Sequence, residues 1–403
     1  MTQPTTVDIF SPTFKANPYP TYVSLRDNQP ICRIITPEGQ PLWLITRYED
    51  CLAVLKDDRF VKNVRAMLTP EQAAQFPPMP EALKPLSANM LDMDGASHDR
   101  LRSLVHKAFT PRLIEKMQGR IQTIADTLLD KAQARGEMEF MTDFAFPLPI
   151  TVIGEMLGIP SDVYQQFREW TNALLNTGLT ENVEHLLPVV QAFIDYLREL
   201  FEQRRQQPAD DLISALIRAE ESGDTLSEDE LLAMVFILIV AGHETTVNLI
   251  GNGTLALLQN PDQLALLRRD PSLIKSAMEE LLRFCGPLET ATERYASTDI
   301  AIGGEIIPQG EMVLVGLASA NRDPRQFENP EVLDITRQNN RHIAFGQGVH
   351  YCVGAPLARL ETQIAFTTLL RRLPNLALNA DSEAIAWRPS FVIRGLERLP
   401  VKF

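Results

Sequence analysis

The stretch Phe345-Gly346-Gln347-Gly348-Val349-His350-Tyr351-Cys352-Val353-Gly354 decides the fold of this chain of 403 residues. Its three glycines allow tight turns and a close approach of the backbone to a flat partner. Directly after it, Pro356 is typical of a first helical turn, and apolar residues then recur at helical spacing. The stretch therefore predicts a glycine-rich loop that places Cys352 just before the start of a helix.

Cys352 could serve several chemistries. A thiolate at the start of a helix is stabilised by the helix dipole and by unpaired backbone N–H groups, which suits a nucleophile or a metal ligand. A papain-like nucleophile needs an activating base and a different surrounding motif, and a zinc site needs further Cys or His ligands nearby. A planar iron macrocycle needs glycine for clearance, one axial thiolate and cationic donors for its carboxylates, and this combination fits. A buried structural cysteine is the alternative if Cys352 is taken alone.

The ten residues quoted above resemble the haem-binding loop of cytochromes P450, and the motifs below extend the resemblance over nearly the whole chain. The resemblance implies a mostly α fold with small β-sheets, in one large domain of residues 1–403 with a long central helix over the haem. It implies haem b (iron protoporphyrin IX) as cofactor and Cys352 as the axial ligand of the iron. The other loop residues that it assigns to haem binding are Phe345, Gly346, His350 and Gly354, with His350 as a propionate donor.

Composition and charge restrict the function further. The chain is 45% hydrophobic and carries a formal net charge of −14, which predicts a globular protein and argues against nucleic-acid binding. Its four cysteines lack paired spacing, which favours reduced thiols in a cytoplasmic compartment. The N-terminal segment shows no apolar signal or anchor, and the apolar run 231–242 is too short to span a bilayer. Together with the resemblance, this predicts a soluble, monomeric P450 of bacterial type without a membrane anchor.

Hydrophobic periodicity and turn residues predict the elements along the chain. Helices are expected at 17–27 and 48–56, from a cap at Gly95 or Ser97 to about residue 109, and at 114–134, 144–157, 161–178 and 183–205. Strands are expected at 31–35 and 42–46 around a turn at 37–39, at 288–292, and as short runs within 376–403. The segment 60–91 is expected to be a long loop with helical pieces.

A capping box at Ser227 and Glu230 predicts the start of a helix that ends before Asn260-Pro261. A helix of roughly 30 residues is about 45 Å long, and the first half of this one is apolar all round, so it must cross the core. Ala241-Gly242-His243-Glu244-Thr245-Thr246 then places a carboxylate and hydroxyls where burial without partners costs several kcal/mol. We expect the Thr245 hydroxyl to bond the carbonyl of the residue one turn earlier and Gly242 to leave a notch beside it.

These six residues resemble the acid–alcohol pair of the central helix in cytochromes P450. The resemblance implies that Thr245 steadies oxygen bound at the iron and that Glu244 helps relay protons to it, so both are predicted to be catalytic. It places Ala241 and Gly242 against the haem. A helix that simply reaches the surface here is the alternative.

Three further motifs match the family. His98 and Arg102, four residues apart on one helix face, resemble its His-x-x-x-Arg, and Arg294 matches its propionate-binding arginine. A casual basic pair on a solvated face is the alternative for the first two. Glu280 and Arg283 resemble the family's buried Glu-x-x-Arg pair, which ties its helix to the loop before the haem. As an exposed pair they would contribute only ~0.3 kcal/mol.

The resemblance implies a monooxygenase that inserts one oxygen atom from O2 into a hydrophobic small molecule, by hydroxylation or epoxidation. Electrons would come from a separate ferredoxin or flavodoxin with its NAD(P)H reductase. The overall likeness is to enzymes that hydroxylate macrolides and polyketides, and a fatty acid, steroid or terpenoid is the alternative substrate. By the same resemblance, the residues lining the substrate cavity are Met90, Leu91, Ile237, Val240, Ala241, Leu288, Thr290, Ala291 and Phe391.

Two other functions remain as alternatives. One is a peroxygenase driven by hydrogen peroxide, whose known members carry Arg-Pro where this chain has Glu244-Thr245. The other is a non-catalytic haem sensor or carrier, which explains Cys352 but leaves the cost of burying a carboxylate in the central helix unexplained.

Overall fold

The computed structural model describes residues 7–36, 39–67, 80–175, 186–220, 226–381, 385–390 and 392–403. The chain divides into two compact units. We call the first the sheet unit; it contains Met1–Val61, Gln118–Leu148 and Glu244–Phe403. The second, the helical unit, contains Lys62–Met117 and Pro149–His243. The single domain expected from the sequence stays a prediction.

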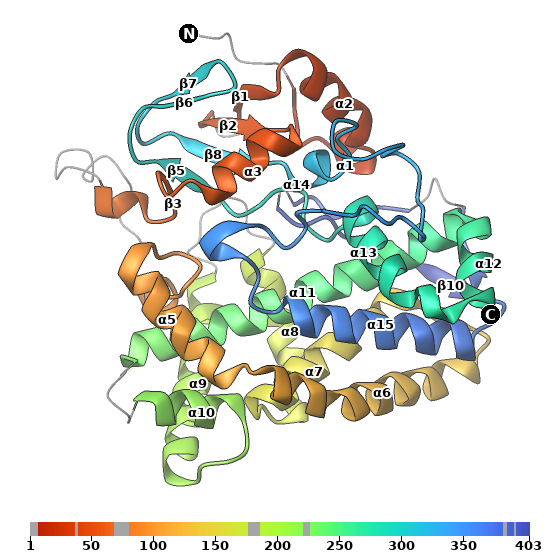
Figure 1. Cartoon of the computed structure of the whole chain (residues 1–403). Helices are drawn as coiled ribbons and strands as arrows, with labels where there is room; N and C mark the ends of the chain where they lie inside the picture. The colour runs from red at the N-terminus through yellow and green to blue at the C-terminus, as the bar shows by residue number, and fades with distance from the viewer. Residues whose placement is uncertain are drawn as a thin grey trace. The chain divides into compact units, whose positions relative to one another are not determined.

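Figure 1 shows the helices and strands of the chain. By their residue ranges, the named strands of the described residues all lie in the sheet unit. They are β1 (Ile31–Ile35), β2 (Pro41–Ile45), β3 (Phe60–Val61), β4 (Glu137–Glu139), β5 (Arg294–Ala296), β6 (Ile300–Ile302), β7 (Glu305–Ile307), β8 (Met312–Val315), β9 (Ala377–Leu378) and β10 (Pro400–Lys402). The largest sheet has five strands in the order β1-β2-β8-β5-β3, and only its β2–β8 pair is parallel. The predicted N-terminal hairpin is confirmed, because β1 pairs antiparallel with β2 from Ile31–Ile45 to Ile35–Pro41. Part of its turn lies outside the described residues.

The sheet unit also carries short helices and one long one. They are α1 (Pro12–Ala16), α2 (Tyr19–Asn28), α3 (Tyr48–Lys56), η3 (Met141–Ala145), α12 (Pro261–Arg269), η6 (Pro271–Leu273), α13 (Ile274–Cys285), α14 (Leu317–Ala320), η7 (Gly348–His350) and α15 (Ala355–Arg372). Three helices run from one unit into the other: α6 (Pro111–Gln133), α7 (Pro147–Leu157) and α11 (Glu228–Gln259). Helix α3 has the bounds predicted from the sequence, and α2 begins two residues later than predicted, at Tyr19.

The remaining helices belong to the helical unit. They are η1 (Val64–Met67), η2 (Glu81–Leu86), α5 (Gly95–Ala108), η4 (Ser161–Val163), α8 (Tyr164–Leu175), α9 (Leu187–Gln206) and α10 (Leu212–Glu220). The sequence analysis missed α10. Its signal was present, because Asp211 accepts the backbone N–H of Ser214 at 2.7 Å, which is the action of a capping side chain at a helix start.

The strand predicted at 288–292 is wrong. This segment makes one isolated bridge, between Leu288 and Ile393, and otherwise bends. Its backbone N–H groups go to different neighbours: Glu289 donates to the carbonyl of Val392 at 2.8 Å and Ala291 to that of Val315 at 2.9 Å. Because no single neighbour continues along the segment, no ladder forms.

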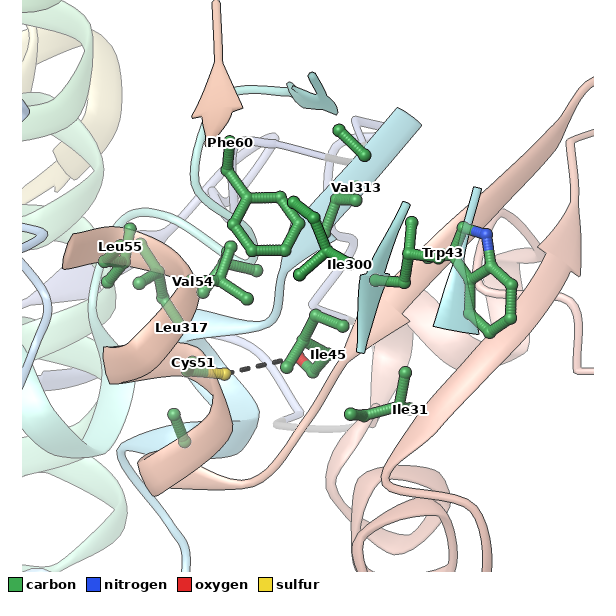
Figure 2. Packing of buried hydrophobic residues seen from close by; sticks show 14 of the residues in the cluster. Ile31, Trp43, Ile45, Cys51, Val54, Leu55, Phe60, Ile300, Val313 and Leu317 are labelled. Atoms are coloured by element: carbon green, nitrogen blue, oxygen red, sulfur yellow. Dashed lines mark hydrogen bonds between the residues drawn. The ribbon is translucent and has the colours of Figure 1, made fainter. Parts of the chain in front are cut away.

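Figure 2 shows the apolar core that supports the large sheet. Val54 and Leu55 of α3 pack with Val313 of β8 and Phe60 of β3 in one buried cluster. Burial of each such side chain contributes about 1.5–3 kcal/mol. The thiol of Cys51 in this cluster donates to the carbonyl of Ile45 at 3.3 Å, so its polar hydrogen is satisfied.

Helix α11 begins with the predicted capping box. Ser227 N–H donates to Glu230 Oε2 at 2.8 Å, and Glu230 N–H donates to Ser227 Oγ at 3.2 Å. By length and composition α11 could cross a membrane, but 72% of its most apolar window is buried inside the protein. That burial is typical of the core helix of a globular protein.

Candidate haem site

Cys352 differs from the other three cysteines of the chain in burial and in chemistry. Cys32, Cys51 and Cys285 are buried, whereas Cys352 is exposed. Burial raises the pKa of Cys32 and Cys285 to about 12, and it raises that of Cys51 well above its ordinary value. Those three thiols therefore stay protonated, and only Cys352 presents its sulfur as a candidate thiolate ligand.

The loop before Cys352 has the tight turns that its glycines predict. Gly346 and Gly348 have φ values of +70° and +75°, in the left-handed region that other residues rarely adopt. A side chain on Gly348 would also start 2.5 Å from the carbonyl oxygen of Leu55 in α3. The N–H of Cys352 donates back to the carbonyl of Phe345 at 3.0 Å, which closes the loop.

Helix α15 follows the loop as predicted, with Pro356 in its first turn. Gly354 is its N-cap residue and has an ordinary φ of −80°, so its lack of a side chain is not needed for a turn. A Cβ there would meet the Cys352 sulfur at 3.8 Å. Glycine at this position therefore leaves room beside the sulfur, and the positive end of the α15 dipole favours a thiolate there.

A charged cluster that the sequence analysis missed connects the Cys352 loop to the neighbouring helices. Arg359 of α15 donates from Nε and Nη2 to the two carboxylate oxygens of Glu279 in α13, at 2.6 and 2.8 Å. Its guanidinium lies over the Phe345 ring, 4.5 Å from the centroid, and Nη1 reaches the Tyr351 hydroxyl at 3.4 Å. His342 Nε2 lies 3.0 Å from Glu279 Oε2. The cluster thus fixes both ends of the Cys352 loop to α13 and α15.

This cluster predicts a specific response to acid. Burial raises the pKa of Glu279, but hydrogen bonds and charges from Arg359 and His342 outweigh burial and lower that pKa from 4.5 to about 2. Because the folded-state pKa is the lower one, Glu279 stabilises the folded protein above about pH 4.5 and loses this contribution as the pH falls towards 2. Glu279→Gln should therefore lower the unfolding temperature most above pH 4.5, with the difference from wild type shrinking below that pH.

The measurement is thermal unfolding of the ferric holoprotein from pH 7 down to the lowest pH at which it folds. Glu49→Gln is the control, because Glu49 is an exposed carboxylate on α3. A Glu279→Gln difference that stays constant with pH would contradict the assigned role of the carboxylate charge.

One face of α11 is only partly covered, although the rest of its middle is buried. Ala241 is exposed, and Ile237, Val240, Gly242 and Thr245 are half-buried. These positions recur three to four residues apart, so they share one face of the helix. The alternative of a helix that simply reaches the surface here does not hold, because Glu244 and the flanking His243 and Thr246 are almost fully buried.

The buried carboxylate of Glu244 has partners that offset its desolvation. Arg388, from the C-terminal segment, forms an ion pair with Glu244 Oε1, and the Asn248 amide donates to the same oxygen at 3.2 Å. Asn248 also donates to the Glu244 backbone carbonyl at 2.7 Å. The sequence analysis missed both residues. Asn248 lies one turn after Glu244 and could have been found from helical spacing.

The predicted haem-carboxylate donors divide between the two units. His98 and Arg102 lie on α5 of the helical unit, as predicted, and His98 is buried with Nδ1 3.0 Å from Asp99 Oδ1. Arg294 and His350 lie in the sheet unit. Arg294 is 5% exposed on β5 and donates from Nη1 to the Phe60 carbonyl at 3.2 Å. Their role towards a propionate stays a prediction.

Glu280 and Arg283 form the buried pair that the family resemblance implied. Both side chains are 0% exposed, and two parallel hydrogen bonds of 2.8 Å join them. Arg283 also donates to the carbonyls of Asn321, Pro330 and Val332 at 2.8–3.0 Å. These contacts tie α13 to the chain between α14 and the Cys352 loop.

The predicted substrate residues differ in how far they are buried. Met90 and Leu91 are half-buried on a turn that Asn89 fixes by accepting the Leu91 N–H at 2.8 Å. Leu288 and Ala291 are half-buried too. Thr290 is 0% exposed, and its role towards a substrate stays a prediction. Phe391 lies outside the described residues.

The residues fit a haem in their chemistry. One exposed sulfur lies at the positive end of α15, next to a glycine that leaves space beside it. Arginine and histidine are available as donors for anionic groups, as the resemblance requires. A haem-thiolate site needs one thiolate ligand from the protein and donors for two propionates, and this donor set supplies both kinds.

Comparison with known proteins identifies the family of the chain. The family model described as cytochrome P450 matches residues 30–383. The polyketide biosynthesis cytochrome P450 PksS of Bacillus subtilis (strain 168) is 46% identical over 391 residues, covering 96% of both chains. The cytochrome P450 monooxygenase PikC of Streptomyces venezuelae is 45% identical, covering 97% of this chain and 92% of PikC. The crystal structure of myxobacterial cytochrome P450 CYP267B1 in complex with myristic acid has a TM-score of 0.94 and 45% identity, covering 98% of both chains. With its fold, its single exposed cysteine and its relatives in accord over nearly the whole length, the chain belongs to the cytochrome P450 family of haem-thiolate monooxygenases.

Proposed function

We propose that this monooxygenase binds haem b through Cys352 and hydroxylates or epoxidises a hydrophobic skeleton of polyketide or macrolide type. The single observation that carries the site is the exposed sulfur of Cys352 at the start of α15, in a chain whose other three cysteines are buried. A thiolate ligand donates electron density to haem iron and so favours cleavage of the O–O bond of O2.

The residues of α11 take the proton steps in this proposal. Thr245 lies on the partly covered face of the helix, so its hydroxyl can hydrogen-bond to an oxygen there. Glu244 precedes it as a buried carboxylate that can carry one proton at a time. Proton transfer by a positioned group contributes about 10²–10⁴-fold to a rate, and burial keeps unwanted water from the same site.

The character of the substrate follows from the half-buried apolar side chains. These are Met90, Leu91, Ile237, Val240, Leu288 and Ala291. Apolar lining of this kind favours an apolar small molecule. PksS is named for polyketide biosynthesis, whereas CYP267B1 was crystallised with myristic acid, so fatty acids are the alternative substrate class to compare.

The electron supply is also part of the proposal. Bacterial members of the family use O2 and redox partners of the ferredoxin type. We assign to this chain a separate ferredoxin or flavodoxin with its NAD(P)H reductase, and action as a cytoplasmic monomer. A reconstituted system containing each carrier in turn, with NADPH oxidation as the readout, tests the carrier. The oligomeric state is tested by light scattering.

The proposed site is tested by spectroscopy of the purified protein. The reduced, CO-bound form should show the absorption band of a thiolate-ligated haem, and a histidine-ligated spectrum would refute Cys352 as the ligand. Polyketide lactones, fatty acids, steroids and terpenoids are then screened for a change of haem spin state. A polyketide-type compound should produce the largest shift at the lowest concentration.

Thr245→Ala tests the proton relay. Without the hydroxyl, reducing equivalents should be diverted from product to hydrogen peroxide, with product per NADPH falling roughly a hundredfold, at the lower end of what proton-transfer groups contribute. Peroxide and product are measured together at saturating substrate.

The matched control for this variant is Thr254→Ala on the same helix. The Thr254 hydroxyl is buried and has no hydrogen-bond partner among the described residues, so its loss should leave coupling unchanged. Unchanged coupling in Thr245→Ala would favour a non-catalytic haem protein. Peroxide-driven turnover faster than any reductase-driven turnover would favour a peroxygenase.

A further inference from the structure

The C-terminal segment forms a hairpin that reaches α11 beside Glu244. We call residues 386–390 and 392–397 the C-terminal hairpin. Arg388 N–H donates to the carbonyl of Gly395 at 2.9 Å, Glu397 N–H donates to that of Ala386 at 3.0 Å, and Trp387 bridges to Leu396. These cross-links hold Arg388 at a fixed place on the hairpin. Because its backbone is fixed, Arg388 can orient the group that its side chain contacts, which is the carboxylate of Glu244.

Its side chain contacts the proposed proton-relay acid. Arg388 Nη1 forms the ion pair with Glu244 Oε1, and Asn248 donates to that same oxygen at 3.2 Å. The Glu244 side chain is 3% exposed and that of Arg388 is 18% exposed. The pair thus joins a buried carboxylate to a cation that is partly exposed to solvent. Such a pair allows protons from solvent to reach the buried carboxylate.

The hairpin also sets the position of Asn248. A Cβ on Gly395 would lie 1.9 Å from Asn248 Oδ1, so the hairpin backbone fits against this amide only because residue 395 is glycine. The hairpin therefore carries Arg388 and packs against Asn248, two groups that contact Oε1 of Glu244.

The other edge of the hairpin joins the segment that carries Leu288. Arg394 N–H donates to the carbonyl of Pro287 at 2.8 Å, and Glu289 N–H donates to that of Val392 at 2.8 Å. Leu288 belongs to the proposed substrate surface. The hairpin that orients the acid is therefore continuous with the backbone beside the substrate.

We propose that Arg388 is a positioning residue for Glu244: it holds the carboxylate at Oε1 and marks the route by which protons from solvent reach it. This inference rests on the proposed role of Glu244. A hydronium ion from solvent gives its proton to the Glu244 carboxylate and leaves as water. The neutral carboxyl loses its attraction to the guanidinium, turns, and passes the proton to the Thr245 hydroxyl oxygen, which gives up its own proton to the oxygen it is hydrogen-bonded to. The carboxylate, charged again, returns to Arg388. No electrons move in this step, because the redox partner supplies them.

The test uses the holoprotein with a ferredoxin and its NADPH reductase, with myristic acid as the probe. Arg388→Gln should raise the hydrogen peroxide share of consumed O2 as much as Glu244→Gln does, and Arg388→Lys should restore at least half of the coupling. The double variant should be no worse than Glu244→Gln alone, because the arginine acts through the acid. The solvent isotope effect on NADPH oxidation should rise in Arg388→Gln, since proton delivery becomes slower.

A readout independent of turnover is the unfolding temperature of the ferric holoprotein. The shifts caused by Arg388→Gln and Glu244→Gln should be non-additive in the double variant, as for any pair in contact. Arg371→Gln is the matched control, because Arg371 forms an ion pair with Asp126 at 3.0 Å but is 60% exposed. It should leave the peroxide share and the isotope effect unchanged.

The outcomes separate the two proposals. If Glu244→Gln couples normally, the proposed relay by Glu244 fails. If Glu244→Gln is impaired and Arg388→Gln is not, or if the two temperature shifts add, the role of Arg388 alone is overturned.

Discussion

Replacing Cys352 by alanine is expected to abolish the thiolate spectrum and O2-dependent product formation. The reason is that the other three sulfurs cannot substitute, because burial keeps Cys32, Cys51 and Cys285 protonated. Losing an outer partner of a metal ligand already costs about 10–100-fold in metal affinity or activity, and loss of the ligand itself should exceed this. Haem content per chain, the reduced CO spectrum and product formation measure the effect.

Cys352→Ser and Cys32→Ala complete this experiment. Serine keeps the size of the side chain but replaces the thiolate by a poorly ionised hydroxyl, so it should also lose the thiolate band. The Cys32 thiol donates a long hydrogen bond, 3.8 Å from its sulfur to the Leu44 carbonyl, and its replacement should leave the spectrum intact. A Cys352→Ser protein with wild-type spectrum and turnover would overturn the assignment.

Local sequence signals predicted those parts of the site whose residues lie close together in the sequence. The capping box of Ser227 and Glu230 and the loop before Cys352 both depend on residues less than a dozen positions apart. Such spacing fixes which backbone groups can meet, because a helix or a tight turn leaves few alternatives. The start of α11 and the start of α15 could therefore be predicted from sequence.

Partners that are distant in sequence could not be predicted in this way. Arg388 meets Glu244 across 144 positions, and Arg359 meets Glu279 across 80. Arginines are common enough that nothing in the local sequence distinguishes these two from the exposed ones. Only the tertiary fold decides which cation reaches a buried carboxylate, although the buried carboxylate itself predicts that some cation must.

The buried carboxylate of Glu289 also has partners that are distant in sequence. Its Oε1 accepts from Lys15 at 3.2 Å, across 274 positions, and from the Tyr22 hydroxyl at 3.0 Å. In the sequence, Glu289 lies inside a segment that was expected to be a regular strand beside the substrate. Glu289 needs these partners because it is buried, and the backbone N–H groups of the segment donate to two different neighbours, Val392 and Val315. This explains why the segment bends and forms no ladder.

The largest effect on stability is expected from Glu280→Gln. The Glu280 carboxylate accepts from Arg283 through two hydrogen bonds of 2.8 Å, from Arg337 at 3.1 Å and from the Asp334 N–H at 2.9 Å. Glutamine keeps the shape but removes the charge, which leaves two buried guanidinium groups without their counter-ion. Removing one partner of a buried ion pair costs about 3–5 kcal/mol, so the free energy of unfolding should fall by this amount. Urea unfolding of the ferric holoprotein measures it.

The chain offers a matched control in Glu202 and Arg205 of α9. This pair has the same spacing of three residues and an ion pair of 2.6 Å, but the Glu202 side chain is 62% exposed. Glu202→Gln should change the free energy of unfolding by less than about 1 kcal/mol, because exposed ion pairs contribute little. If Glu280→Gln destabilised the protein no more than Glu202→Gln, the buried pair would not be what holds α13 to the chain before the Cys352 loop. Burial, and not the Glu-x-x-Arg spacing by itself, therefore makes Glu280 structural.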